Sequence, residues 1–96
     1  QHQLPEFQGV YVLHNQNTDR NYVGQSIHVI DRVYQHFTGH GSPDVYVDYR
    51  HGQPFLIYLV RLDTSSFPSL NALEKAAIHK YHAYTDGYNK TRGNGG

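Results

Sequence analysis

Five polar side chains in this sequence have types and spacings that suit the cleavage of a phosphate ester. Two are phenols, Tyr11 and Tyr22, on segments with the composition of strands. Arg32 and His36 are four residues apart, so their side chains meet on one face of a helix. Glu74 supplies a carboxylate further along the chain. A guanidinium neutralises phosphate oxygens, an imidazole transfers protons near neutral pH, and a carboxylate binds a divalent cation. These groups are sufficient for metal-assisted hydrolysis of a phosphodiester.

Glu74 is the sharpest local signal, because it lies in the middle of an apolar helical stripe. An unpaired buried carboxylate is expensive, so we expect a cation, a metal ion or a hydrogen-bond donor as its partner. Two roles without catalysis are also open: Glu74 could complete a capping box that starts at Asn71, or it could pair with Arg32. The stripe consists of Leu70, Leu73, Ala77, Ile78, Tyr81 and Tyr84.

The remaining side chains could also have purely structural roles. Arg32 and His36 would suit a solvated helix edge, and tyrosines on strands are usually packing residues. Gly24 is less ordinary, because a glycine inside a strand indicates a bend or a close approach to the backbone.

Histidine pairs offer a second kind of site. His36 and His40 are four residues apart, and His79 and His82 are three apart, so either pair could share a zinc ion on a helix. The chain has no Cys and no HExxH motif, and His79 and His82 fall on or near the exposed face of their helix. Scattered surface histidines are therefore favoured over a zinc site.

Local patterns predict the elements that would position these groups. Residues 9–13 and 21–25 have the features of strands, and the turn-forming residues 15–20 between them predict a hairpin that carries both phenols. Residues 26–36 have the apolar spacing of a helix, which would carry the guanidinium and the imidazole. Glycines follow that helix from Gly39 onward and are expected to end it.

The second half of the chain adds a short helix, a strand and a longer helix. Ser42 followed by Pro43 is a good helix start, so a short helix is expected to about residue 50. The apolar run within residues 54–62 predicts a buried central strand, and residues 69–84 form the predicted helix that carries the carboxylate. This order indicates an α+β domain, a small antiparallel three-stranded sheet flanked by helices.

Composition limits the classes of function. A chain of 96 residues forms one domain with a modest core, and nine tyrosines suggest that tyrosine builds part of it. Net charge is zero, with eight Lys and Arg against eight Asp and Glu, although proteins that bind nucleic acid tightly are usually basic. This predicts weak, local binding that is assisted by a cation, protonated histidine or a fused module. The lack of Cys excludes disulfides, and no apolar run approaches the ~18 residues of a membrane span.

The ends of the chain differ from its middle. The chain contains no methionine, so we expect it to be a piece of a longer protein. Residues 1–8 are predicted to be an N-terminal extension, residues 9–90 the folded domain and residues 91–96 a flexible tail.

Six positions, in order over about residues 9–89, resemble the signature of the GIY-YIG nuclease family. The resemblance is greatest to the homing-endonuclease-like branch, in which a histidine stands at the place of His36. Gln25 occupies a position where some members carry lysine, so a lysine-assisted mechanism is not available there. The matching positions are Gly9-Val10-Tyr11, Tyr22-Val23-Gly24, Arg32, His36, Glu74 and Asn89.

The resemblance implies hydrolysis of a DNA strand with a single divalent ion, Mg²⁺ or Mn²⁺, bound by Glu74. One of the two tyrosines would activate the attacking water, and the resemblance leaves both open. Asn89 would orient the phosphate or brace a tyrosine or Glu74. The implied catalytic residues are Tyr11, Tyr22, Arg32, His36, Glu74 and Asn89, and the predicted substrate contacts are Gly24, Gln25 and His40.

Two functions of different classes remain open at this point. The first is the endonuclease, acting on DNA or RNA, as part of a larger protein such as a toxin, a restriction enzyme or a homing enzyme. The second is a non-catalytic nucleic-acid- or protein-binding module on the same scaffold. A toxin would have an inhibitor or immunity protein, and would act in the cytoplasm after delivery as part of a secreted protein. We expect no membrane partner.

Overall fold

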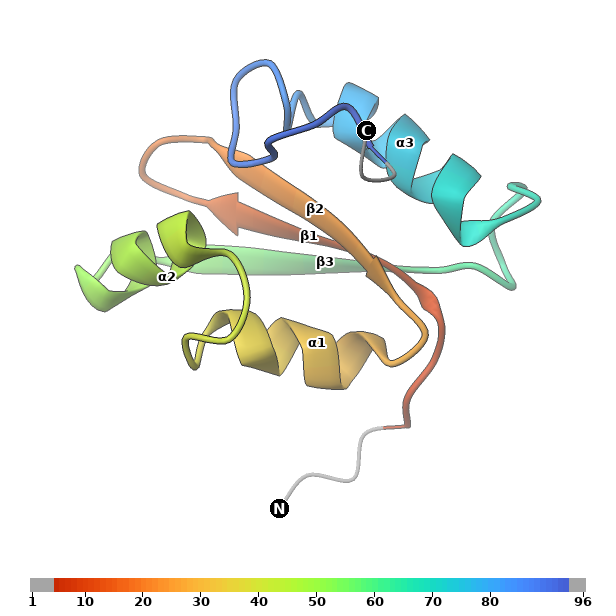
Figure 1. Cartoon of the computed structure of the whole chain (residues 1–96), viewed down its shortest axis with the longest axis horizontal. Coiled ribbons are helices and arrows are strands. Elements are labelled where there is room, and N and C mark those ends of the chain that lie inside the picture. Colours follow the sequence, from red (N-terminus) through yellow and green to blue (C-terminus); the bar gives the residue numbers. More distant parts are fainter. Residues whose placement is uncertain (1–4, 94–96) are drawn as a thin grey trace.

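The computed structural model describes residues 5–93, which form a three-stranded sheet with helices on both faces (Figure 1). The elements follow in the predicted order, and the α+β prediction is confirmed. They are β1 (Gly9–Asn15), β2 (Asn21–Ser26), α1 (Val29–His36), α2 (Pro43–Arg50), β3 (Phe55–Arg61) and α3 (Leu70–Lys80).

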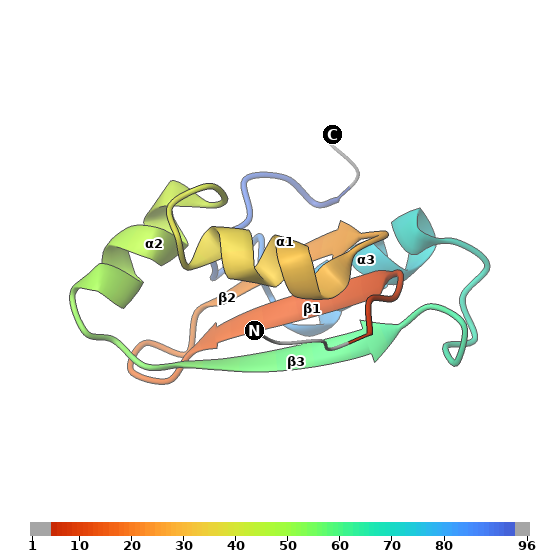
Figure 2. The ribbon, with the colours of Figure 1, turned by 90° about the horizontal axis from the view of Figure 1, so that it is seen from below.

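The strand order is β2-β1-β3, and both neighbouring pairs are antiparallel. Residues 54–62 do form a strand, but the prediction that it is buried and central is wrong. Leu56, Ile57, Tyr58 and Leu59 are each between 40% and 45% exposed. The helices α1 and α3 pack mainly on β1 and β2, which leaves β3 uncovered at the edge (Figure 2). An apolar run of this length indicates a strand, but it does not say which position the strand takes in the sheet.

Alternate residues of β1 divide the core into two clusters. Val10 and Val12 face α3, whereas Tyr11 and Leu13 face α1 and α2, which cover the opposite side of the sheet (Figure 2). The phenol of β1 therefore points toward the helix that carries the predicted guanidinium and imidazole.

The first helix begins later than predicted. It starts at Val29, because β2 continues through Ser26. The carboxylate of Glu6 accepts hydrogen bonds from the backbone N–H groups of Ile30 and Asp31, both at 2.8 Å. A negative charge at this end is favourable for a helix, so Glu6 stabilises the first turn of α1.

The last helix is shorter than predicted. It ends at Lys80, and His82 adopts a left-handed conformation with φ of 53°, as is common just after a helix. Its N-cap is Ser69, whose hydroxyl accepts a hydrogen bond from the N–H of Ala72 at 3.1 Å. The predicted capping box starting at Asn71 is therefore wrong.

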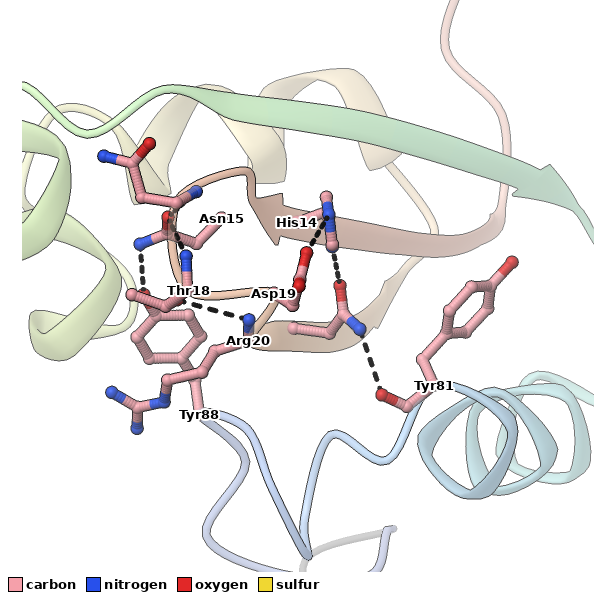
Figure 3. Close-up of polar contacts among 9 residues, drawn as sticks. His14, Asn15, Thr18, Asp19, Arg20, Tyr81 and Tyr88 are labelled. Atoms are coloured by element: carbon pink, nitrogen blue, oxygen red, sulfur yellow. Dashed lines mark hydrogen bonds and ion pairs between the residues drawn. The ribbon is translucent and has the colours of Figure 1, made fainter.

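A buried polar network joins the β1–β2 turn to α2 and to the C-terminal segment. Figure 3 shows its contact between Asn15 and Tyr88. The Asn15 amide, which is buried, donates hydrogen bonds to Oε1 of Gln53 at 2.6 Å and to the hydroxyl of Tyr88 at 2.9 Å. Tyr88 in turn donates to the carboxylate of Asp48 on α2 at 2.5 Å. The guanidinium of Arg20 lies 4.3 Å from the centre of the Tyr88 ring. These contacts hold Tyr88, and hence the residue after it, beside β2.

The predicted N-terminal extension (residues 1–8) contacts the domain through its last residues. The backbone carbonyls of Phe7 and Gln8 accept hydrogen bonds from later parts of the chain. Residues 1–4 lie outside the described residues, as do the last three residues of the predicted tail (residues 91–96). None of the helices in the described part of the chain is long and apolar enough to cross a bilayer.

Candidate active site

Tyr11 and His36 form the buried centre of the candidate site. The hydroxyl of Tyr11 and Nε2 of His36 are 2.7 Å apart, and the two residues are 1% and 0% exposed. The ring of Tyr22 lies beside both, with its centroid 4.8 Å from that of His36 and 6.3 Å from that of Tyr11. These three predicted residues therefore do come together. The alternative of a solvated helix edge is wrong for His36.

The backbone of the α1–α2 loop decides which nitrogen of His36 carries its proton. The N–H of Ser42 points at Nδ1 of His36 at 2.9 Å, and a backbone N–H can only donate. Nδ1 must therefore be unprotonated, which leaves the proton of the neutral ring on Nε2. Nε2–H then donates to the hydroxyl oxygen of Tyr11. Because the phenol accepts this hydrogen bond, its own proton is available to another acceptor.

Gly41 and Ser42 position the imidazole, a role that the sequence alone did not reveal. A Cβ at Gly41 would lie 2.3 Å from Nδ1 of His36, so a side chain there would push the ring away. Ser42 caps α2 as predicted, with its hydroxyl accepting from the N–H of Val45 at 3.4 Å, while its own N–H holds the imidazole. The available signal was their position five and six residues after His36, within reach of a tight loop.

The environment of His36 makes it a fixed hydrogen-bond donor. Burial, and to a lesser extent the positive charge of Arg32, lower the pKa of His36 from 6.5 to about 4. The ring is therefore neutral at physiological pH. This disagrees with the expectation that His36 transfers protons near neutral pH, and it agrees with the role of holding the Tyr11 hydroxyl.

We expect the protein to lose stability in acid because of this histidine. The pKa of His36 is 6.5 in the unfolded chain and about 4 in the folded protein. Its contribution is therefore complete above pH 6.5 and is lost as the pH falls through this interval, by about 3 kcal/mol of unfolding free energy. Urea unfolding at a series of pH values measures the loss, and His36→Gln should flatten it. An equally steep fall in His36→Gln would contradict the assignment.

Arg32 lies at the edge of the same centre and is partly buried. Its Nη1 donates to Oε1 of Gln35 at 2.7 Å and to the backbone carbonyl of His40 at 3.2 Å. Burial raises the pKa of Tyr11 and of Tyr22, and the positive charge of Arg32 opposes that rise in both. The structure thus brings Arg32 to the two phenols, as predicted. The His40 side chain is exposed, and what this residue supplies is a backbone acceptor that orients the guanidinium.

Glu74 reaches the site from α3. Its Oε1 accepts a hydrogen bond from Nε2 of Gln25 at 2.9 Å, and the same Nε2 donates to Oδ1 of Asn71 at 2.9 Å. Beyond the effect of burial, the negative charge of Glu74 raises the pKa of Tyr11 and of Tyr22, so the acid and the phenols share one electrostatic environment. Gln25, a predicted substrate contact, is therefore a partner of the carboxylate in this structure.

Gly24 is the point of close approach that its place in a strand indicated. The Tyr11 hydroxyl packs against Gly24, and a Cβ at residue 24 would be 2.2 Å from the hydroxyl oxygen. We therefore expect Gly24→Ala to displace the phenol, to cost about 1–3 kcal/mol of stability and to reduce cleavage. Thermal melts and a cleavage assay measure the two effects. Unchanged melting and cleavage would show that Tyr11 does not occupy this position in solution.

The side chain of Asn89 pairs with the backbone of β2. Its Oδ1 accepts from the N–H of Val23 at 2.8 Å, and its Nδ2 donates to the carbonyl of Val23 at 2.9 Å. The N–H of Tyr88 donates to the carbonyl of Asn21 at 2.9 Å. The amide thus takes the place of a neighbouring strand at the outer edge of β2. Asn89 thus braces the backbone of β2, a role that differs from the predicted bracing of a tyrosine or Glu74.

Asn89→Ala is expected to loosen this edge. It removes two hydrogen bonds and leaves backbone groups of Val23 without that partner, which should cost about 1–3 kcal/mol. Hydrogen exchange at the Val23 amide should become faster. Lys90→Ala is the matched control, because it removes only an exposed ion pair with Asp44 at 2.7 Å, worth less than about 1 kcal/mol. Equal exchange rates at Val23 in the two variants would contradict the bracing role.

The candidate metal ligand within the described part of the chain is a single carboxylate, that of Glu74. Within residues 5–93, no three His, Cys, Asp or Glu side chains are grouped so that they could hold an ion. A structural zinc ion takes four such ligands, so these residues form no site of that type. Mg²⁺ is different, because it commonly takes one or two carboxylates and completes its shell with water and phosphate oxygens. Glu74, next to two phenols and a guanidinium, fits this second type.

Known proteins share the family profile and the fold of this chain. The profile of the family described as the GIY-YIG catalytic domain matches residues 7–89. The fold is similar to that of the catalytic domain of intron endonuclease I-TevI, solved as a point mutant, with a TM-score of 0.67 at 19% sequence identity. The alignment covers 91% of this chain and 96% of that one. No curated protein sequence gives a significant match.

Proposed function

Because the chain belongs to the GIY-YIG nuclease family, we propose that it is a divalent-metal-dependent endonuclease domain that hydrolyses phosphodiester bonds of DNA. The observation that most supports this proposal is that side chains from β1, β2, α1 and α3 gather around one buried hydroxyl group, that of Tyr11. Tyr11 is hydrogen-bonded to His36, and its pKa responds to the charges of Tyr22, Arg32 and Glu74.

Glu74 would bind the cation, a single Mg²⁺ or Mn²⁺. When bound, such an ion supplies positive charge that stabilises the developing charge on the phosphate and the leaving oxygen. The chain's own contribution is to hold the carboxylate in place. Gln25 supports this role, since its amide donates to one carboxylate oxygen and is itself oriented by Asn71.

Tyr11 is the better candidate for the base that takes a proton from the attacking water. Its oxygen accepts a hydrogen bond from Nε2–H of His36, and a hydrogen bond to an ionised acceptor is stronger than one to a neutral acceptor. The charge of Arg32 also favours the phenolate. Tyr22 contacts the imidazole through its ring, which supports a packing role. Of the two tyrosines, the geometry therefore favours Tyr11 as the base.

Arg32 would bind an oxygen of the scissile phosphate. Its side chain is oriented by Gln35 and by the carbonyl of His40, so little freedom is lost when the phosphate arrives. A fixed positive charge that meets the negative charge of the transition state lowers the barrier without any rearrangement.

We also propose a biological setting for the domain. The domain would act in the cytoplasm as the catalytic part of a toxin, a restriction enzyme or a homing enzyme, with DNA as substrate and RNA as the second possibility. If the parent protein is a toxin, an inhibitor would bind over the site formed by Tyr11, Tyr22, Arg32 and Glu74 and would exclude the substrate.

The test is incubation of the purified protein with supercoiled plasmid, single-stranded DNA and RNA, each with Mg²⁺ and with EDTA. We expect nicked plasmid with Mg²⁺ and none with EDTA. Association that weakens with salt but yields no products under either condition would instead support the non-catalytic binding module.

A further inference from the structure

A groove beside α3 lies outside the site described above. It has a volume of about 620 Å³ and is lined by α3, by the turn after it and by the C-terminal segment, which runs close to the helix in Figure 1. A Cβ at Gly93 would lie 3.4 Å from atoms of both Ile78 and Lys75, so the C-terminal segment packs directly against the helix. Ligand sites typically have volumes of about 300–1,000 Å³, so the groove is large enough for a ligand.

Two cationic side chains, those of Lys75 and Arg92, and two imidazoles lie on the rim of the groove. Lys75 and His79 come from α3, His82 from the turn after it and Arg92 from the C-terminal segment. Among the described residues, no aspartate or glutamate lines the groove. In a chain whose formal net charge is zero, this is a local excess of positive charge. The groove is therefore complementary to an anionic ligand.

The floor of the groove combines small apolar side chains with an aromatic ring. Ala72, Ala76 and Ile78 contribute apolar surface, and Tyr84, which is 39% exposed, contributes its ring. The guanidinium of Arg92 lies 5.2 Å from the centre of that ring. Nucleobases stack on tyrosine while cationic side chains follow the phosphates. An acidic peptide would use the charged rim but has no planar bases for the ring, so a nucleic-acid strand fits the groove better.

The groove and the carboxylate of the candidate active site share the helix α3. Lys75 directly follows Glu74 on α3, and Ile78 is one helical turn further on. Side chains four residues apart on a helix are neighbours, about 5–6 Å apart at Cβ. A strand whose phosphate lies at Glu74 therefore reaches the groove within one turn of the helix.

We propose that the groove binds a single-stranded segment of the substrate next to the scissile phosphate. Lys75 and Arg92 pair with its phosphates, and a base stacks on Tyr84. This assignment rests on the proposed nuclease function and extends it to binding residues outside the catalytic centre. It supplies a local source of affinity in a domain that has no overall positive charge.

Two double variants with the same change in charge test this assignment. Lys75→Ala with Arg92→Ala removes two cations from the groove. Lys80→Ala with Arg50→Ala removes two cations elsewhere, and Lys80 is a stringent control because it lies on the same helix but lines a different pocket. Thermal melts of all variants check that folding is retained.

Kinetics and binding give separate readouts. For the groove pair we expect KM for a single-stranded DNA substrate to rise about tenfold, with kcat within about twofold of the parent, because uniform binding is lost. Affinity for a fluorescent single-stranded oligonucleotide is measured in EDTA, and the slope of log K against log salt should become shallower by about 1.4. Tyr84→Ala should weaken the same binding about 5- to 100-fold without a change in the slope.

The outcomes separate this inference from the proposed function. Equal KM values and salt slopes in the two double variants would overturn the groove assignment while leaving the nuclease intact, and so would unchanged binding by Tyr84→Ala. A parent protein that cleaves nothing and binds no oligonucleotide would remove the proposed function and the groove assignment together.

Discussion

Tyr11→Phe is expected to reduce the rate of DNA cleavage about 10³-fold at saturating substrate, within the range of about 10²–10⁴ that a positioned base contributes. The phenylalanine ring fills the same space between β1 and α1, but the oxygen that accepts from His36 and would take the proton of water is gone. Nicking of supercoiled plasmid under single-turnover conditions measures the loss.

Tyr22→Phe is the matched control for this change, since it removes the same atom from the neighbouring ring. We expect a rate within about tenfold of the parent, because Tyr22 contacts the imidazole through its ring. A larger loss in Tyr22→Phe than in Tyr11→Phe would reverse the assignment of the base. Tyr11→Phe also leaves Nε2–H of His36 without its partner, at about 1–3 kcal/mol, so rates are to be compared well below both melting temperatures.

The dependence of the rate on pH gives an independent check of the same residue. Burial, together with the charges of Tyr22 and Glu74, raises the pKa of Tyr11 above its ordinary value, although Arg32 opposes the rise. The phenolate is therefore the minor form at neutral pH, and with Tyr11 as the proposed base the rate of the parent should increase as the pH is raised. The residual rate of Tyr11→Phe should lack this increase.

Glu74→Gln is expected to reduce cleavage by at least about 10³-fold, which corresponds to about 4 kcal/mol of lost transition-state stabilisation. The amide has almost the same shape, and its carbonyl oxygen can still accept from Gln25, so the fold should be retained. Plasmid nicking in Mg²⁺ measures the rate. Titration calorimetry with Mg²⁺ should show that the variant binds the ion more weakly, a readout that does not depend on activity.

Glu6→Gln is the control for the loss of one glutamate charge. Glu6 accepts hydrogen bonds from the backbone at the start of α1, so its replacement should lower the melting temperature slightly and leave the cleavage rate unchanged. If Glu74→Gln cleaved as fast as Glu6→Gln, the carboxylate of α3 would have no part in the chemistry.

The elements of this fold were predictable because their signals are local. Turn-forming residues between two short apolar segments indicated the hairpin, and Ser42 before Pro43 indicated the start of α2. The place of β3 in the sheet was not predictable in this way. Strand order depends on which faces of the sheet the helices cover. The run from Leu56 to Leu59 is apolar although its strand lies at the edge, so its composition does not distinguish an edge strand from a central one.

The candidate site likewise contains residues that could be predicted from the sequence and groups that could not. Side chains that we propose to act directly, such as Tyr11 and Arg32, could be identified because their chemistry is specific to the residue type. The groups that orient them are largely backbone atoms or amides: the N–H of Ser42, the carbonyl of His40 and the side chain of Gln25. Every residue type has a backbone carbonyl, and nearly every type has a backbone N–H. Such roles therefore cannot be predicted from residue types, and they become visible only in the folded structure of the loops.

The contact between Asn89 and Val23 joins residues that are 66 positions apart in the chain. A growing polypeptide leaves the ribosome from its N-terminus, and domains generally fold as units. The hairpin and α1 emerge early, but the outer edge of β2 is closed only when residue 89 has left the exit tunnel. We therefore expect nascent chains that have not yet exposed this residue to be inert, so that translation itself delays the appearance of a competent nuclease in the cell that makes it.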